Sequence, residues 1–277
     1  MLRRTAVTGI FLALAISHAL GAEVSSASAK LTAEQVVEKN VAARGGLQLW
    51  RAVQTLSMTG QMEAGGNDRS PRSVPAPALR PGGLQLPKRP SEQARLPFRI
   101  DLKRGRKMRL EVDFRGQTAI QVYDGVNGWK LRPFLNRHEV EPYTQEEMKT
   151  AALQADLDGP LVDYVAKATK AELEGSEKIE GEENYRLKLT MKNGQTQRVW
   201  VNAKTFLETK VEGTPRRLDG RSHSVEIFMR DYRAVNGLML PYLLETKVQG
   251  VAQTEKIEIE KVTVNPKLED SRFAKLR

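Results

Sequence analysis

The sequence predicts a mainly β domain of the α+β class: a half-open antiparallel β-barrel of about eleven strands, with a few helices plugging or covering its apolar concave face. Three observations lead to this prediction. From residue 98 onward, apolar and polar residues alternate with a period of two, which is typical of antiparallel strands with one buried and one wet face. Turn signals such as Asn193-Gly194 and Asn236-Gly237 separate the strands. The apolar face is large and the predicted helices are few, so the sheet must curve, form a sandwich or be plugged.

The composition places the 277-residue chain among soluble globular proteins, with 40% hydrophobic and 28% charged residues. Cysteine is absent, which excludes disulfides, thiolate metal sites, a thiol nucleophile and a cysteine for lipid attachment. Because the whole chain has three histidines, a histidine-rich metal centre is excluded as well. We therefore expect no cofactor and no metal.

Residues 1–22 have the three-part pattern of a cleaved secretory signal peptide. Arg3 and Arg4 precede an uncharged stretch whose apolar centre is residues 9–16, and small residues follow it. We expect cleavage after residue 21 or 22, with a second option after residue 29. A membrane anchor is the alternative, but the apolar run is short for a spanning helix. The mature protein is therefore expected to be exported and soluble.

The mature chain is expected to open with a helix capped by Thr32, with Gln35 at the reciprocal capping-box position. Gly45-Gly46 ends this helix, and a strand over about residues 53–63 follows. The apolar face of the helix consists of Val36, Val37 and Val41.

Residues 65–97 interrupt the pattern, because seven of the 13 prolines and many arginines fall there. Proline lacks a backbone donor, so such a stretch is expected neither to pair as a strand nor to continue as a helix. We interpret it as a long, basic surface loop inserted in the sheet. A loop without any binding role is the alternative.

The strands beyond this insert fall into two series separated by a helical interlude. In the first series, strands over 107–115 and 118–122 lead to a turn at 124–128 and a return strand from Trp129. In the interlude, Thr144 with Glu147 predicts a capping box, and Pro160 predicts the start of a second short helix. In the second series, Asn193-Gly194 is interpreted as a two-residue hairpin turn. The remaining strands are expected around 185–191, 199–201, 207–211, 225–229, 238–248 and 257–264. We take residues 31–277 as one domain.

No sequence motif for catalysis stands out. The chain has no G-x-S-x-G elbow, phosphate-binding loop or H-E-x-x-H pattern. His138 and His223 are interpreted as exposed histidines. The residues Asp156, Asp158 and Asp163 resemble a carboxylate cluster, but helix capping and a solvated face explain them more simply.

The chain is basic, with 44 Lys and Arg against 34 Asp and Glu and a net charge of +10. Basic residues crowd the stretch 103–109 and recur through the insert. In an exported protein this argues against nucleic acid and favours an anionic membrane surface, at about 1 kcal/mol per basic residue near the surface. A solvated face that keeps the protein soluble is the alternative.

Several segments carry a resemblance to a known family. They are the opening helix over 31–46, a Y-D-G-x-x-G-W hairpin at 123–129, the stretch 158–164, and D-Y-R followed by N-G-L-M-L-P over 231–241. In these segments the chain resembles the LolA/LolB-like superfamily of periplasmic lipoprotein carriers, also called outer membrane lipoprotein-sorting proteins. The resemblance implies a periplasmic half-open barrel with helices as a lid, holding acyl chains in an apolar cavity. The insert and the chain length depart from the basic pattern, and the missing lipid-attachment cysteine favours a soluble carrier.

An acyl chain needs only shape and an apolar lining, and each buried CH₂ contributes about 0.8 kcal/mol. Trp129 is expected at the cavity mouth because it follows a glycine turn, whereas Trp50 and Trp200 are expected to be packing or surface aromatics. For every lining residue, ordinary core is the alternative, since barrels of this size are often filled. The candidate lining residues are the inward members of the alternating strands: Leu110, Val112, Phe114, Ile120, Val122, Trp129, Leu131, Leu187, Leu189, Val225, Ile227 and Leu240.

These features together predict a monomeric periplasmic carrier that binds acyl chains of lipoproteins or lipids for sorting to the outer membrane, without catalysis. An envelope-stress sensor or interaction protein with the same fold and no transported cargo is the alternative. An enzyme such as a hydrolase is a third hypothesis.

Overall fold

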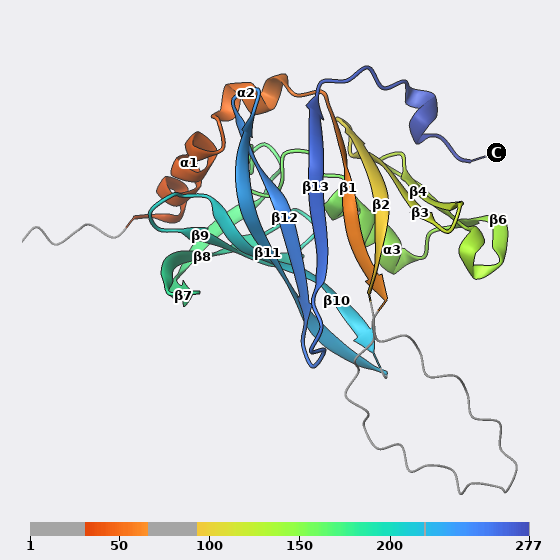
Figure 1. Cartoon of the computed structure of the whole chain (residues 1–277). Helices are drawn as coiled ribbons and strands as arrows, with labels where there is room; N and C mark the ends of the chain where they lie inside the picture. The colour runs from red at the N-terminus through yellow and green to blue at the C-terminus, as the bar shows by residue number, and fades with distance from the viewer. Residues whose placement is uncertain (1–30, 66–92, 219, 277) are drawn as a thin grey trace, which may run out of the picture. The chain divides into compact units, whose positions relative to one another are not determined.

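Antiparallel strands dominate the computed structural model, which describes residues 31–65, 93–218 and 220–276 (Figure 1). Within these ranges, thirteen strands form one sheet in the order β6-β5-β4-β3-β2-β1-β13-β12-β11-β10-β9-β8-β7. Neighbours in the sheet are therefore mostly neighbours in sequence, as in a meander, and β1 pairs with β13 to join the two series. The strands are β1 (Thr55–Gly65), β2 (Gln93–Lys103), β3 (Lys107–Phe114), β4 (Gln117–Tyr123), β5 (Gly128–Arg132), β6 (Arg137–Pro142), β7 (Lys170–Ile179), β8 (Glu182–Thr190), β9 (Thr196–Asn202), β10 (Glu208–Leu218), β11 (Arg221–Val235), β12 (Leu238–Val248) and β13 (Glu255–Val264).

This architecture confirms the predicted half-open antiparallel barrel with few helices, but it has two strands more than expected. The two additional strands, β6 and β7, are the edges of the sheet. Their residues are largely exposed and charged, so they lack the apolar alternation by which the other strands are predicted.

Two helices begin where the capping residues Thr32 and Thr144 predict, whereas a short helix after Gly46 has no side-chain cap and was not predicted. In the described part of the chain, the α-helices are α1 (Ala33–Ala43), α2 (Leu47–Ala52) and α3 (Gln145–Gln154), and the short 3₁₀ helices are η1 (Pro133–Leu135) and η2 (Asp270–Phe273). In α1 the Gln35 amide donates to Thr32 Oγ1 at 3.3 Å, and the Thr32 amide donates to Gln35 Oε1 at 2.9 Å. Thr144 and Glu147 make the same reciprocal pair at the start of α3.

The second short helix predicted from Pro160 is wrong. Residues 156–168 form a series of turns without an α-helix. Asp163 and Ala168 both have left-handed backbone conformations, with φ of 54°, and an α-helix cannot continue through such residues.

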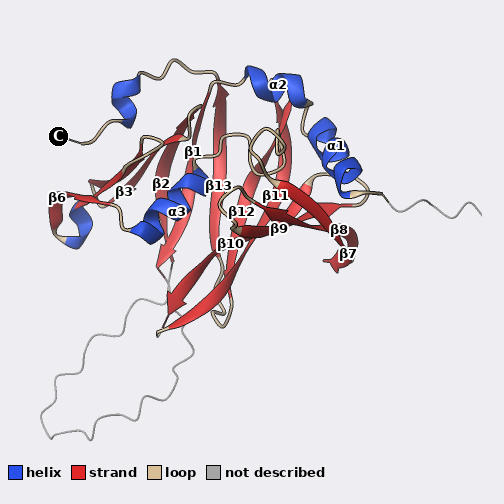
Figure 2. Ribbon diagram, turned by 180° about the vertical axis from the view of Figure 1, so that it is seen from behind, coloured by secondary structure: helices blue, strands red, loops and turns tan. Residues whose placement is uncertain are grey.

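Helix α3 lies against one face of the sheet, which we call the concave face (Figure 2). Its buried residue Ala151 packs in one core cluster with Leu56 of β1, Phe98 of β2 and Met108 of β3. The turns after α3 add Leu157 and Val162 to the same cluster. We call residues 155–168 the plug segment. The sheet is thus covered from inside by one helix and an irregular segment.

The C-terminal segment lies on the other face, which we call the outer face. Arg272 donates to the carboxylates of Asp101 on β2 and Glu111 on β3. The neighbouring Phe273 is buried. A segment far away in sequence therefore buries part of the outer face of β2 and β3.

The insert contains more strand than its proline content predicts. The β1–β2 ladder continues to Gly65 opposite Gln93, and Pro97 pairs with Gln61 inside it. Pairing of β2 with β3 begins at Phe98, so Pro97 lies where β2 has a single strand neighbour and its missing amide is tolerated. Residues 66–92 and the predicted signal peptide lie outside the described residues.

Of the two predicted two-residue turns, one is confirmed. Asn236 and Gly237 join β11 to β12 with φ of 50° and 83°, the left-handed values that such a turn requires. Asn193-Gly194 instead sits in a longer connection over residues 191–195 between β8 and β9. There the Gln195 amide donates to the Asn193 side chain at 3.1 Å, which stabilises the wider loop.

Candidate functional site

The register of the strands decides which apolar residues face α3. Residues paired across an antiparallel ladder lie on the same face of the sheet. Leu110 of β3 pairs with Gln121 of β4, and Val122 pairs with Arg109. The predicted lining residues of these strands therefore lie on two faces. Leu110, Val112 and Phe114 are on the concave face, and Ile120, Val122, Trp129 and Leu131 are on the outer face.

The prediction that all these residues point inward is thus wrong for β4 and β5. Both faces of β4 carry apolar residues. The sequence of β4 alone therefore does not show which of its faces turns toward α3. Val122 is fully buried although it lies on the outer face, where the C-terminal segment covers β3. Trp129 pairs with Val122 and also lies on the outer face, so it is not at the mouth of the concave face.

Most of the predicted lining residues in the second series of strands are buried, and one is partly exposed. Leu187, Leu189, Val225 and Leu240 are buried, and Ile227 is partly exposed. Leu240 belongs to the core cluster under α3. The other aromatic expectations hold. Trp50 is a fully buried packing residue, and Trp200 is buried on the outer face, where its indole donates to Glu177 at 2.8 Å.

A row of apolar side chains that sequence reasoning did not identify crosses the concave face. Met229 of β11 pairs with Leu244 of β12, Leu244 with Ile257 of β13, Ile257 with Met62 of β1, and Met62 with Leu96 of β2. We call these five residues the apolar row. Every member is partly exposed. The next residues on the same face are Phe98, two positions beyond Leu96 on β2, and Ile259, two positions beyond Ile257 on β13. Both are buried in the core. The apolar row therefore marks where the packed core ends and an open apolar surface begins.

An aromatic corner continues the apolar row beyond β2. The β2–β3 ladder ends at the pair Phe98 and Val112, and Phe114 follows two residues beyond Val112, on the same face of β3. The Phe134 ring packs edge-on against Phe114, with centroids 5.8 Å apart and planes at 68°. The guanidinium of Arg115 lies 5.2 Å from the Phe114 ring centroid. Leu135 beside Phe134 is 50% exposed. Phe114, Arg115, Phe134 and Leu135 together form this aromatic corner.

The far side of the concave face is bounded by the β10–β11 hairpin. A pocket of about 380 Å³ is lined by Glu146 in the first turn of α3 and by the hairpin residues Thr214, Pro215, Arg217 and Ser222. The end of this hairpin therefore reaches the first turn of α3.

Two ion pairs hold α3 and the plug segment on the sheet. Lys130 of β5, which is buried, donates to both Glu147 carboxylate oxygens at 2.5 and 2.6 Å. Burial raises the pKa of Glu147, but the bonds from Lys130 and the Thr144 cap outweigh this and hold the pKa below its ordinary value. In the plug segment, both Asp158 oxygens accept from Arg104 at 2.8 and 2.9 Å.

A buried polar network lies next to these contacts. Arg44 donates through Nη1 to the Asp158 carbonyl at 2.9 Å and to Glu208 Oε1 at 3.1 Å. The Tyr232 hydroxyl donates to Glu208 Oε2 at 3.2 Å. Burial, with the nearby Glu208 carboxylate, holds the pKa of Tyr232 well above its ordinary value. The network joins the end of α1, the plug segment, β10 and β11.

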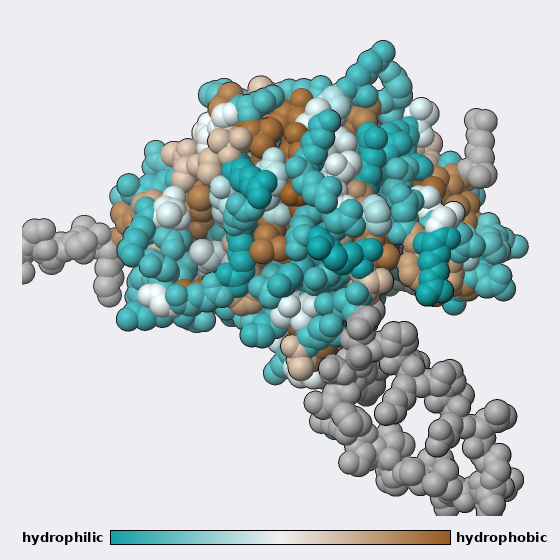
Figure 3. Space-filling model, in the orientation of Figure 1, coloured by the Kyte–Doolittle hydropathy of each residue, from teal (hydrophilic) through white to brown (hydrophobic). Residues whose placement is uncertain are grey.

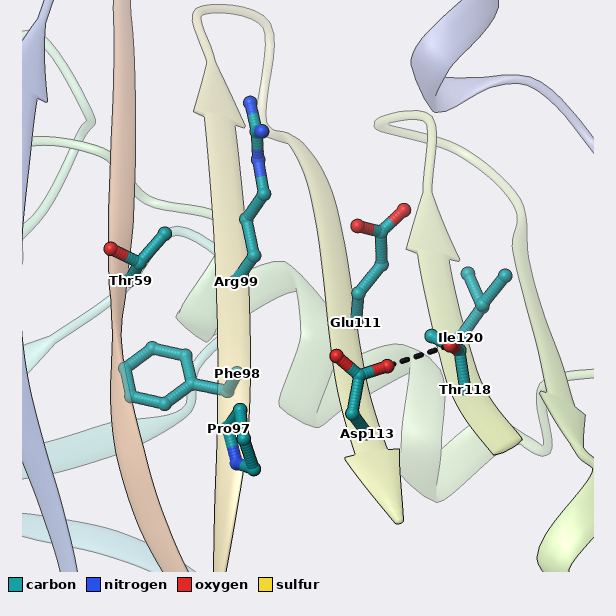
Figure 4. Close-up of a pocket in the computed structure, with 8 residues that line it drawn as sticks. All are labelled: Thr59, Pro97, Phe98, Arg99, Glu111, Asp113, Thr118 and Ile120. Carbon is teal, nitrogen blue, oxygen red and sulfur yellow. Dashed lines mark hydrogen bonds between the residues drawn. The ribbon is translucent and has the colours of Figure 1, made fainter. Parts of the chain in front are cut away.

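A second hollow lies on the outer face (Figure 4). It has a volume of about 550 Å³, and α3 lies behind the strands in this view. Its walls combine polar and charged residues with apolar ones: Thr59, Arg99, Glu111, Asp113 and Thr118, with Pro97, Phe98 and Ile120. The Asp113 carboxylate accepts from the Thr118 hydroxyl at 2.6 Å. The face of the molecule shown in Figure 3 is mostly hydrophilic, with scattered hydrophobic residues. The outer hollow therefore has a mixed lining of charged and apolar residues, whereas the apolar row continues across five strands.

Asp156, Asp158 and Asp163 do not form the carboxylate cluster that they resemble in the sequence, and Asp158 is buried, which differs from the expected solvated face. Asp156 pairs with Lys167, Asp158 with Arg104, and Asp163 with Arg51, each as a separate ion pair. In the described ranges no group of three or more His, Cys, Asp or Glu side chains is placed to hold a metal. His138 is exposed, and His223 Nδ1 lies 2.8 Å from the Gln249 carbonyl oxygen. None of the helices in the described part of the chain is long and apolar enough to cross a membrane.

Comparison with known proteins gives a clear result for the fold alone. No protein-family model matches the chain, and no curated protein matches it. Among solved structures, a LolA superfamily protein from Nitrosomonas europaea superposes with a TM-score of 0.54 at 14% identity, covering 89% of this chain and 99% of that one. The fold is LolA-like.

Two further structures agree with this LolA-like assignment. A DUF1329 family protein from Desulfovibrio piger has a TM-score of 0.54 at 14% identity, covering 87% of this chain and 97% of that one. A domain described as an outer membrane lipoprotein-sorting protein from Vibrio parahaemolyticus has a TM-score of 0.52 at 13% identity, covering 86% and 94%. At these identities the similarity establishes the architecture, and the site of the LolA-like domain has to be argued from its own residues.

Proposed function

We propose that this LolA-like domain is a periplasmic carrier that binds the acyl part of a lipid or lipoprotein on its concave face, for sorting to the outer membrane. The observation that carries the proposal is the apolar row. Its five side chains are partly exposed on the same face that α3 and the plug segment cover. A monomeric soluble protein gains by burying such a strip, and an acyl chain laid on it removes apolar surface on both partners from water.

The chemistry of such a carrier needs no nucleophile and no metal. Each buried CH₂ contributes about 0.8 kcal/mol, so a chain of about 14 carbons contributes on the order of 10 kcal/mol before the costs of immobilisation. Release is then a matter of separating apolar surfaces, without a covalent step. One structural neighbour is described as an outer membrane lipoprotein-sorting protein, which supports this proposal.

Residues 1–22 are proposed to export the protein, and residues 31–277 to form one carrier domain. We further propose that the carrier is a monomer. The exposed edge strand β7 carries charged residues such as Glu172 and Lys178, and Gly175, with φ of 135°, lies where its register shifts. Charges and bulges on an edge oppose strand pairing between copies.

The experiment that tests the proposal compares two adjacent leucines of β12. Leu244 belongs to the apolar row, whereas Leu243 pairs with Arg230 and Glu258 on the outer face. Both are partly exposed, so the same substitution has a similar cost in folding at either position. We expect Leu244→Gln to weaken binding of a fluorescent fatty-acid probe severalfold, and Leu243→Gln to leave the affinity unchanged.

Native mass spectrometry of the protein purified from the periplasm adds an independent readout. A stoichiometric added mass that releases acylated material on solvent extraction supports the carrier. A clean protein mass together with no probe uptake overturns it and favours the alternative, an interaction or sensor protein with the same fold.

A further inference from the structure

We infer that the ligand of the concave face is a single long acyl chain with an anionic head, lying across the strands with its head at Arg115 in the aromatic corner. This inference rests on the proposed carrier function and adds to it the number of chains, their direction and the class of head group.

The length of the apolar row sets the length of the chain. The row crosses five neighbouring strands, from β11 to β2. Neighbouring strands lie about 4.8 Å apart, so the four gaps span about 19 Å. An extended alkyl chain with carbon–carbon bonds of about 1.5 Å advances about 1.25 Å per carbon, so about 15 carbons cover the row. This matches a common fatty acyl chain of about 14 to 16 carbons.

The width of the apolar row admits one such chain. On the side toward α3, the next positions on the face are occupied by the buried core residues Phe98 and Ile259. On the other side, the next positions are Ile227, Thr246 and Glu255 on β11, β12 and β13, and Ala64 and Ala94 on β1 and β2. Glu255, in the middle of this line, holds Arg216 in a bidentate ion pair at 2.7 Å. The apolar strip is therefore bounded by packed core on one side and interrupted by Thr246 and the Glu255–Arg216 ion pair on the other, so a second parallel chain would have to cross these polar groups.

The two ends of the apolar row differ in charge, which sets the direction of the chain. At the β11 end, Met229 Sδ lies 3.5 Å from the Tyr232 hydroxyl, which in turn contacts the buried carboxylate of Glu208. Glu208 is itself paired with Arg44 at 3.1 Å, so the cation of this buried network is already neutralised and offers nothing to an anionic head. At the other end, Arg115 is exposed over the Phe114 ring, and no carboxylate of the described residues lies within ion-pair distance of it. The guanidinium is thus placed to donate to a carboxylate or phosphate.

The test measures binding of four ligands with sixteen-carbon chains to the full-length mature protein. Hexadecanoate and a lysophospholipid with a phosphate head carry one chain and a negative charge, hexadecanol carries one chain without charge, and a diacyl phospholipid carries two chains. We expect hexadecanoate or the lysophospholipid to bind more tightly than hexadecanol, and the tighter of the two identifies the source of the head. The diacyl lipid is expected to bind more weakly than its single-chain counterpart.

The variant Arg115→Gln provides the second arm, with Arg106→Gln as its matched control. Both arginines are exposed turn residues with left-handed backbones, at φ of 50° and 58°. Arg106 lies in the β2–β3 turn, at the opposite end of β3 from the aromatic corner. Arg115→Gln is expected to weaken binding of the anionic ligand about threefold to tenfold and to leave hexadecanol unaffected. Arg106→Gln is expected to change neither.

The outcomes separate this inference from the proposed function. If hexadecanol binds as tightly as hexadecanoate and Arg115→Gln changes nothing, the head-group assignment is overturned while the carrier stands. If the diacyl lipid binds most tightly, the single-chain inference is overturned. If none of the four ligands binds, the carrier function itself is overturned, and this inference with it.

Discussion

Replacing Asp158 tests whether the plug segment is held on the sheet by its ion pair with Arg104. The two guanidinium nitrogens of Arg104 lie 2.8 and 2.9 Å from the two carboxylate oxygens of Asp158. The Asp158 side chain is 5% exposed and the Arg104 side chain 32% exposed. The pair therefore lies at the boundary of the core, where it joins the plug segment to the turn between β2 and β3.

The magnitude follows from this burial. Removing one partner of a fully buried ion pair costs about 3–5 kcal/mol, because the other charge is left without compensation. Since a third of Arg104 is exposed, water replaces part of the interaction, and Asp158→Ala is expected to cost about 2 kcal/mol. For a domain of this size, about 2–4 °C in Tm corresponds to each kcal/mol, so Tm should fall by about 4–8 °C. Arg104→Ala should cost more, because it leaves the better-buried carboxylate unpaired.

Thermal unfolding of the two single variants and the double variant measures the coupling energy directly. Asp270→Ala is the control, since that carboxylate is 69% exposed and pairs with Lys103 and Lys107 at the surface. Its Tm should match that of the wild type. The reasoning is refuted if Asp158→Ala shifts Tm no more than Asp270→Ala does, or if the double variant shows no coupling between Arg104 and Asp158.

The remaining predictions concern a close approach, a helix cap and acid stability. Gly45→Ala should strongly lower Tm, because the Cβ of an alanine at this position would lie 2.3 Å from the Gly237 carbonyl oxygen. Gly46→Ala should lower Tm less, because its Cβ would meet no atom within 4 Å. Equal effects of the two substitutions would contradict the close contact at Gly45. Thr144→Ala should cost about 1 kcal/mol by removing the α3 cap, and Thr144→Ser should restore it; an unchanged Tm for the alanine variant would show that α3 does not depend on its cap. Glu147 has a lowered pKa in the folded state, so its contribution to stability should be complete above pH 4.5 and disappear as the pH falls below this value. In Glu147→Gln, the free energy of unfolding should therefore decrease less on acidification. A pH profile identical to that of the wild type would contradict the lowered pKa of Glu147.

Local signals in the sequence predicted the local structure well. The capping boxes at Thr32 and Thr144 mark the starts of α1 and α3, and Asn236-Gly237 forms the turn that its sequence indicates. Each of these features depends on residues within a few positions of one another. The antiparallel, one-sided character of most strands is likewise encoded in their alternation.

Local sequence signals did not predict the edge strands or the conformation of the plug segment. β6 and β7 are charged and exposed, so nothing in their composition distinguishes them from loops, and they become strands because a neighbour provides hydrogen-bond partners. The stretch after Pro160 has a helix-like beginning, yet Asp163 and Ala168 have left-handed backbones and the stretch forms turns, with Asp163 paired to Arg51 of α2.

By itself, the sequence determined that this protein is a mostly antiparallel β structure of the half-open barrel type with few helices. Only the tertiary structure decided which apolar residues meet. A period of two fixes which residues of one strand share a face, but it leaves open which face turns inward and which residues of the next strand lie alongside. Pairing with β3 therefore turned Ile120 and Val122 to the outer face, and pairing across five strands assembled the apolar row from Met229 to Leu96. The physical reason is that register depends on turns, bulges and packing partners far apart in the chain, and no single strand contains that information.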